Sequence, residues 1–185
     1  EFPKIISVDD HVIEPPDTWT KRLPSKYHEV GPRVVYAPKG EGTFKGGKLT
    51  VSMGEPGSGP DVAWWLYEEL RRPLMRLDAA VGYDRDDIDL RLVNYDEMRP
   101  GAYSVKERLE DMDTNWIESS LCFPTFPRFC GQTFTEAKDK DLALLCVQAY
   151  NDFQVDEWCM PSDGRLIPLT IIPLLSEQFL TAADD

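Results

Sequence analysis

Two residues near the start of the chain, Asp9 and His11, have types and a spacing that suit metal binding. They follow the apolar segment Ile5–Val8, which has strand propensity, and alternate residues of a regular strand point to the same face. Asp9 and His11 would therefore project together at a strand end. A carboxylate oxygen beside an imidazole nitrogen supplies half of a divalent metal site. The pair would equally suit a strand end at which Asp9 caps the next turn, and the residues alone leave both interpretations open.

A second candidate segment, Phe123–Cys130, combines several aromatic residues with one cation. Arg128 could bind a substrate carboxylate through its bidentate guanidinium group. The alternative is a packed loop in which Arg128 pairs with a surface carboxylate. No histidine stands beside Cys130, so we expect a buried, unreactive thiol there. The only other histidine, His28, is expected at the surface.

Composition excludes several classes of partner. The chain has 185 residues and a net charge of −13, which argues against nucleic acid or an anionic membrane as a partner. No apolar run approaches the ~20 residues that a membrane span needs. The four cysteines form no C-x-x-C pair, and we expect reduced thiols in a cytoplasmic protein without a signal peptide.

The elements that must position these residues alternate between strands and helices. We predict strands over 4–9, 117–123 and 166–174 and helices over 104–116 and 139–159, and we interpret 24–100 as a long insertion with short strands at 33–36 and 48–51. Such alternation indicates βαβ units and a parallel sheet. Active residues of these folds lie beyond the carboxyl ends of the strands, which places both candidate segments on one rim. Trp64, Trp65 and Tyr67 are expected in the core or at a partner contact.

Several segments together resemble the amidohydrolase-related branch of the amidohydrolase superfamily, which includes aminocarboxymuconate-semialdehyde decarboxylase and its relatives. The resemblance implies a TIM barrel with a metal at its mouth, and Asp9 and His11 match the first two ligand positions. Glu14 matches an acidic position that binds the metal or braces His11; a surface or salt-bridged carboxylate is the alternative. The similar segments are Val8–Pro15, Tyr95–Tyr103, Arg108–Asp113, Glu118–Thr125, Ala149–Phe153 and Gly164–Leu169.

The resemblance covers only the first half of such a barrel, because the family's later ligand histidine and catalytic aspartate have no counterpart here. We therefore expect an α/β fold, the N-terminal portion of a TIM barrel, as one partial domain over 1–185 with regular βα units over 103–175. We expect another polypeptide or self-association to complete it. The implied function is metal-dependent hydrolysis of a small-molecule substrate, with zinc the favoured ion and manganese or iron also suitable. A decarboxylase of the same family, or a noncatalytic subunit, are the alternatives.

Overall fold

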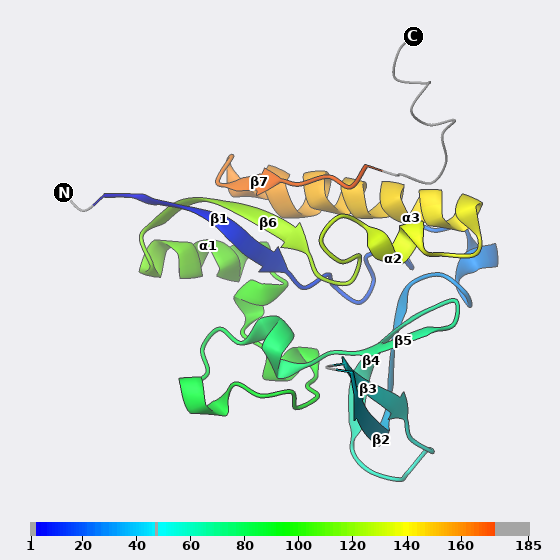
Figure 1. Ribbon diagram of the computed structural model, residues 1–185. Helices are drawn as coiled ribbons and strands as arrows, with labels where there is room; N and C mark the ends of the chain where they lie inside the picture. The colour runs from blue at the N-terminus through cyan, green and yellow to red at the C-terminus, as the bar shows by residue number, and fades with distance from the viewer. Residues whose placement is uncertain (1–2, 47, 173–185) are drawn as a thin grey trace.

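The computed structural model describes residues 3–46 and 48–172. A three-stranded parallel sheet runs through its upper layer in the order β1-β6-β7, with β1 at Ile5–Val12, β6 at Ile117–Pro124 and β7 at Leu166–Pro168 (Figure 1). The three predicted strands are thus present, although β7 is shorter than the predicted one, whose residues 173–174 lie outside the described residues. Parallel strands need helical crossovers, and the intervening helices supply them.

Helices connect these strands. They are α1 (Val105–Thr114), α2 (Gln132–Thr135) and α3 (Lys140–Asp152), and α3 continues into a π-helix over Phe153–Cys159. The α3 helix begins at Asp139, whose Oδ1 accepts a 2.9 Å hydrogen bond from the Leu142 backbone N–H. The sequence predicts an apolar stripe at helical spacing, and its members Leu142, Cys146 and Phe153 are buried.

Two details of α1 differ from what its sequence pattern predicts. Ser104-x-x-Glu107 has the spacing of a capping box, and Leu109, Met112 and Trp116 belong to an apolar stripe at helical spacing. Ser104 and Glu107 form no reciprocal capping box, because the Ser104 hydroxyl donates to the Glu107 carboxylate and accepts no hydrogen bond from the backbone N–H groups of the helix. Trp116 was predicted on the buried stripe, but its side chain is exposed. The helix ends at Thr114, and Trp116 has a left-handed backbone (φ 57°), so helical spacing no longer decides where it points.

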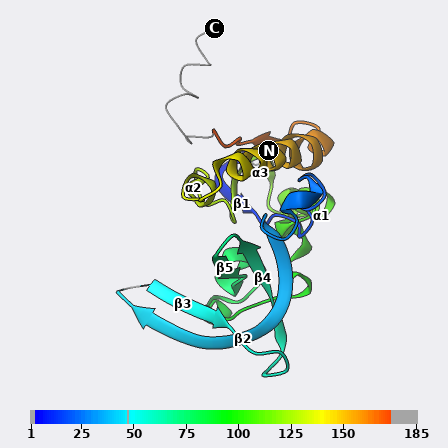
Figure 2. The same cartoon turned by 90° about the vertical axis from the view of Figure 1, so that its right-hand side faces the viewer.

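The predicted insertion contains a separate antiparallel sheet in the order β3-β2-β4-β5 (Figure 2). Its strands are β2 (Arg33–Lys45), β3 (Lys48–Met53), β4 (Asp61–Tyr67) and β5 (Leu70–Pro73). Short 3-10 helices cover Ser25–Tyr27, Arg76–Ala79, Arg85–Asp87, Tyr95–Glu97, Pro100–Ala102 and Met160–Ser162. Both short strands that the sequence predicts are found, and β2 extends well beyond its predicted range.

One aromatic cluster joins the antiparallel sheet to the parallel layer. Trp19 packs edge-on against Trp65 of β4 and against Phe126, which follows β6, with ring centroids 5.2 Å apart in each pair. Trp65 also contacts Phe126 directly, at 4.8 Å. Trp64, Trp65 and Tyr67 are buried, so the core interpretation is confirmed for all three. Burial of such large side chains dominates core energetics, and it fixes the insertion against the rim of the parallel sheet.

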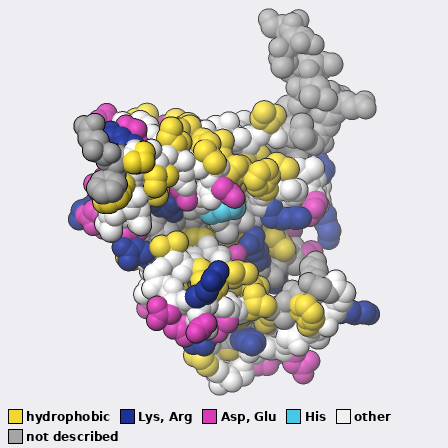
Figure 3. Space-filling view, turned by 60° about the vertical axis from the view of Figure 1, so that its left-hand side comes forward, with side chains coloured by type: hydrophobic (Ala, Val, Ile, Leu, Met, Phe, Trp, Pro, Cys, Tyr) yellow, Lys and Arg dark blue, Asp and Glu magenta, His cyan; other side chains and the backbone are white. Residues whose placement is uncertain are grey.

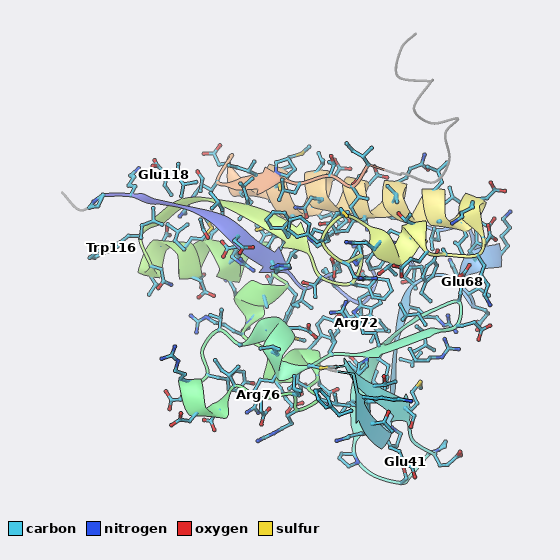
Figure 4. All side chains as sticks on the ribbon, viewed as in Figure 1. Glu41, Glu68, Arg72, Arg76, Trp116 and Glu118 are labelled. Atoms are coloured by element: carbon cyan, nitrogen blue, oxygen red, sulfur yellow. The ribbon has the colours of Figure 1, made fainter. Side chains whose placement is uncertain are left out.

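A polar contact ties the far end of the insertion to α3. The Glu68 carboxylate, in the turn between β4 and β5, accepts 2.9 Å hydrogen bonds from the backbone N–H groups of Lys138 and Asp139. Figure 4 shows Glu68 at the end of this hairpin, near the start of α3. A carboxylate is favourable there because the first N–H groups of a helix lack intrahelical partners.

The parallel sheet does not close into a barrel within residues 3–46 and 48–172. The β1 strand pairs only with β6, which leaves its other edge open. Ile6 and Val8 on this strand are about 60% exposed, at 60% and 62%. Hydrophobic side chains gather over the upper layer on the face shown in Figure 3. An open edge with exposed apolar side chains is a surface that proteins normally cover.

Candidate functional site

The carboxyl ends of β1 and β6 lie side by side and form the rim on which the candidate site stands. His11 is opposite Phe123, and Val12 is opposite Pro124. The His11 and Phe123 rings have centroids 5.9 Å apart. Just beyond β6, the Thr125 Oγ1 lies 3.5 Å from His11 Nδ1. The parallel pairing therefore brings the Asp9–His11 pair and the segment after β6 to one place, as expected.

Asp9 and His11 line one cavity of about 500 Å³. The cavity lies between β1, α1 and the short 3-10 helix Arg76–Ala79, which contributes Leu77 and Asp78. Both side chains are exposed to solvent. The strand itself is irregular, because Ser7 pairs with Ser120 and Asp10 with Cys122, so three steps on β1 match two on β6. This bulge means that simple alternation does not describe the strand around Asp9.

Asp10 has a partner within the sheet. The hydroxyl of Ser120 on β6 donates a hydrogen bond to its carboxylate. Alternation along a regular strand predicts that Asp10 faces away from Asp9 and has a structural role. The contact with Ser120 supports that role, but Asp10 also lines the cavity that contains Asp9 and His11.

Glu14 is fully buried beneath the rim. Its carboxylate accepts hydrogen bonds from the backbone N–H groups of Thr125 at 2.9 Å and Phe126 at 3.0 Å. Its own carbonyl oxygen accepts a 2.7 Å hydrogen bond from the Tyr95 hydroxyl. Burial raises the pKa of the Glu14 carboxyl to about 7, although the backbone hydrogen bonds from Phe126 and Thr125 favour the charged form. Glu14 thus connects the end of β1 to the end of β6.

Arg128 lies on a second cavity, of about 310 Å³, that also has His11 in its wall. Its guanidinium group forms an ion pair with Glu136 at 3.1 Å, and both side chains are more than half exposed. Phe129 lines the same cavity, and its ring stacks on Phe123 with centroids 4.5 Å apart. The ion pair corresponds to the surface-carboxylate alternative, while the cavity places Arg128 where a ligand carboxylate could replace Glu136.

Sequence reasoning did not single out two residues of this rim. Arg72 of β5 lines the second cavity, donates a 2.9 Å hydrogen bond to the Thr125 carbonyl oxygen and pairs with Asp78 at 3.2 Å. Figure 4 places Arg72 between the parallel layer and the antiparallel sheet. No motif around Arg72 in the sequence indicates a role at this site. Thr125, in contrast, directly follows a predicted strand, and that position alone was a usable signal.

Two other expectations concern single residues. Cys130 was expected to be a buried thiol, but the structure leaves it exposed on the loop after β6. The expectation rested on the lack of a neighbouring histidine, and that lack does not decide whether a side chain is buried. All four cysteines are free, as expected. His28 is exposed, as predicted, and its Nε2 lies 3.0 Å from the Leu23 carbonyl oxygen.

A complete metal centre is not formed by the described part of the chain. Within it, no group of three or more histidine, cysteine, aspartate or glutamate side chains has a geometry that could hold a metal ion. Asp9 and His11 share a cavity wall, are exposed to solvent and offer one carboxylate and one imidazole as donors. Three protein ligands are typical of catalytic zinc, so further donors would have to come from elsewhere.

Among the described residues, no helix has the length and apolar character needed to cross a membrane.

The fold has a counterpart among known structures, a mixed α/β arrangement that matches part of an amidohydrolase. One such match is to the crystal structure of an amidohydrolase from Mycobacterium avium subsp. paratuberculosis K-10, with a TM-score of 0.60 and 19% sequence identity. It covers 98% of this chain and 46% of the other, so this chain spans about half the length of the protein it matches. No family model and no curated protein matches the sequence.

Proposed function

We propose that this chain forms part of a metal-dependent hydrolase of the amidohydrolase type, with its site on the rim formed by β1 and β6. The single observation that carries the proposal is the position of His11, which lies in the wall of both cavities. Asp9 lines one of them and Arg128 the other. A metal-donor pair is thus next to a cation able to bind a substrate carboxylate, and both stand at the strand ends where parallel α/β folds place catalysis.

In this proposal Asp9 and His11 supply two metal ligands, and Glu14 braces the rim instead of reaching the ion. The two backbone hydrogen bonds and full burial of Glu14 support bracing over ligation. Zinc suits the donor set, and manganese or iron would also suit it. When bound, such an ion lowers the pKa of a coordinated water and polarises a substrate carbonyl.

The remaining groups of the rim would bind and orient a small-molecule substrate. Arg128 can exchange its exposed Glu136 partner for a ligand carboxylate, because an exposed ion pair contributes only about 0–1 kcal/mol. Phe129, stacked on Phe123, offers an aromatic surface beside it. Arg72 adds a second cation to the same cavity wall. A substrate with a carboxylate and a planar apolar body would match these three contacts.

The cations of the second cavity also support a second candidate, a metal-dependent decarboxylase of the same family. Arg72 and Arg128 would hold a carboxylate within reach of the His11 cavity wall. Detecting released carbon dioxide from an aromatic or unsaturated carboxylic acid would favour this reaction, whereas cleavage of an amide or ester bond would favour hydrolysis. A noncatalytic role is the remaining candidate, and the lack of a third donor among the described residues supports it.

We further propose that the parallel sheet is the N-terminal portion of a TIM barrel, with the antiparallel sheet as an insertion over its rim. The open edge of β1 and the 46% coverage of the matched amidohydrolase support this architecture. Another polypeptide or self-association would cover the edge and bring the missing donors. The antiparallel sheet stands between β1 and α1 in the sequence, which is where an insertion after the first strand would lie.

Metal analysis tests the proposed function. Purified protein, with any copurifying polypeptide retained, is loaded with zinc, dialysed and measured by plasma mass spectrometry. We expect close to one ion per assembled site, and loss of most of it in Asp9→Ala and His11→Ala. His28→Ala is the matched control, because this exposed histidine lies on neither cavity and should keep the metal. Full metal retention in both rim variants would refute the ligand assignment.

A further inference from the structure

Thr125 is held on both sides of its peptide chain by residues from distant parts of the sequence. Its backbone N–H donates to the buried carboxylate of Glu14 at 2.9 Å, and its carbonyl oxygen accepts from Arg72 at 2.9 Å. Glu14 follows β1, and Arg72 comes from β5 of the antiparallel sheet. The Arg72 guanidinium is a charged donor, and hydrogen bonds of charged groups are shorter and stronger than neutral ones. The position of Thr125 is therefore defined more strictly than that of an ordinary loop residue.

The side chain of this fixed residue faces the histidine of the rim. Thr125 Oγ1 lies 3.5 Å from His11 Nδ1, a contact at the long end of the hydrogen-bond range. The pairing of Val12 with Pro124 places the two residues at the adjoining ends of β1 and β6. The backbone of His11 is also held, because its carbonyl oxygen accepts a 2.7 Å hydrogen bond from Arg108. The side-chain orientation of His11 is not set by this backbone contact, and Thr125 contacts the imidazole ring itself.

We infer that Thr125 is a positioning residue for His11: its hydroxyl accepts a hydrogen bond from Nδ1–H and so leaves the lone pair of Nε2 free to face a ligand. Metal-binding histidines commonly donate their second ring N–H to a neighbouring acceptor, which sets both the tautomer and the ring orientation. Here the acceptor is a threonine hydroxyl that Glu14 and Arg72 hold in place. Through Arg72, the antiparallel sheet thereby helps to position a residue of the proposed site.

This inference rests on the proposed function for the metal-binding role of His11. The tautomer of His11 can be measured without any metal. The chain contains two histidines, which simplifies the measurement. His28 provides an internal reference, because its Nε2 lies 3.0 Å from the Leu23 carbonyl oxygen, which can only accept. His28 must therefore carry its proton on Nε2. His11 is expected to carry its proton on Nδ1, so the two rings should give opposite patterns.

The experiment is a long-range proton–nitrogen correlation spectrum of metal-free protein labelled with nitrogen-15 in histidine. It is recorded near pH 8.5, roughly two pH units above the ordinary pKa of a histidine side chain. We expect the Nδ1–H pattern for His11 in the wild type and in Thr125→Ser. In Thr125→Val, which keeps the shape but loses the hydroxyl, His11 should shift towards the Nε2–H pattern, while the His28 signals stay unchanged and report a preserved fold.

The outcomes separate this inference from the proposed function. An Nε2–H pattern for wild-type His11, or a pattern that Thr125→Val leaves unchanged, would overturn the positioning role. The wild-type spectrum decides the first point even if the valine variant does not fold. Zinc affinity, measured by competition with a chromogenic chelator, should fall about tenfold in Thr125→Val and recover in Thr125→Ser. Protein that shows the expected tautomers yet binds no zinc would refute the proposed function and leave the positioning role standing.

Discussion

The carboxylate of Glu14 accepts a 2.9 Å hydrogen bond from the backbone N–H of Thr125, a residue 111 positions later in the chain. This contact joins the ends of two neighbouring parallel strands beneath the rim where His11 stands. A carboxylate buried this deeply is costly unless its oxygens are paired, and backbone donors provide that pairing. The geometry of the candidate site therefore depends on a buried acid that itself lies outside both cavities.

The stability of the metal-free protein should depend on pH through Glu14. Its folded-state pKa is raised to about 7, so the folded protein holds this proton more tightly than the unfolded chain does. Its stabilising contribution is therefore complete below the unfolded pKa of 4.5 and is lost as pH rises through about 7. The loss should be on the order of 3 kcal/mol at full burial. Urea unfolding between pH 5 and pH 8, with chelator present, measures it.

Glu14→Gln is the matched variant for that measurement, because glutamine keeps the size and cannot titrate. The difference in the free energy of unfolding between variant and wild type should change across this interval in favour of the variant. Asp10→Asn serves as the control, since no comparable burial surrounds that carboxylate. A difference profile that stays flat from pH 5 to pH 8 would contradict the buried, neutralised Glu14.

Arg128 should contribute to the binding of anionic ligands. Arg128→Gln removes the guanidinium group from the second cavity, and we expect the Kd of an aromatic carboxylate to rise about tenfold, equivalent to roughly 1.4 kcal/mol. Calorimetric titration with benzoate and with benzamide compares charged and neutral ligands of the same shape. Glu136→Gln should strengthen benzoate binding, because it removes the competing carboxylate. Equal Kd values for benzoate in all three proteins would exclude Arg128 from ligand binding.

Glu68 should stabilise the attachment of the antiparallel sheet to α3. Glu68→Ala leaves the backbone N–H groups of Lys138 and Asp139 without their carboxylate acceptor, which should lower the free energy of unfolding by about 1–3 kcal/mol. The adjacent Glu69 is exposed, and Glu69→Ala should change stability by less than about 0.5 kcal/mol. Thermal and urea unfolding compare the two variants, and indistinguishable losses would mean that the contact contributes nothing specific.

The exposed apolar edge of β1 should mediate association. Val8 is 62% exposed on a strand with an open edge, so Val8→Lys should reduce self-association or copurification of a second polypeptide. Met160→Lys is the control, because Met160 is similarly exposed, at 68%, but lies in a short helix after the π-helix. Light scattering coupled to size exclusion measures the mass. A wild-type protein that behaves as a stable, cooperatively folding monomer at high concentration would contradict this prediction.

The sequence by itself determined the local elements and the residues able to do chemistry. Apolar stretches bounded by prolines predicted β1 and β6, and the spacing of Leu142 and Cys146 predicted α3, because strand and helix periods follow from backbone geometry alone. Asp9, His11 and Arg128 could be selected because few other residues at predicted strand ends have side chains that bind a metal ion or a carboxylate. Their predicted proximity on one rim followed from parallel βαβ topology.

Tertiary structure alone decided which of these groups meet and how they are held. Three features depend on contacts between residues at least 50 positions apart. They are the bulge in β1 where it pairs with β6, the hydrogen bond that buries Glu14 against Thr125, and the hydrogen bond from Arg72 to Thr125. No local pattern encodes such contacts, because they arise only when segments distant in the sequence pack against each other. The same reason explains why Trp116 and Cys130 are exposed contrary to expectation, because side-chain type alone does not decide burial.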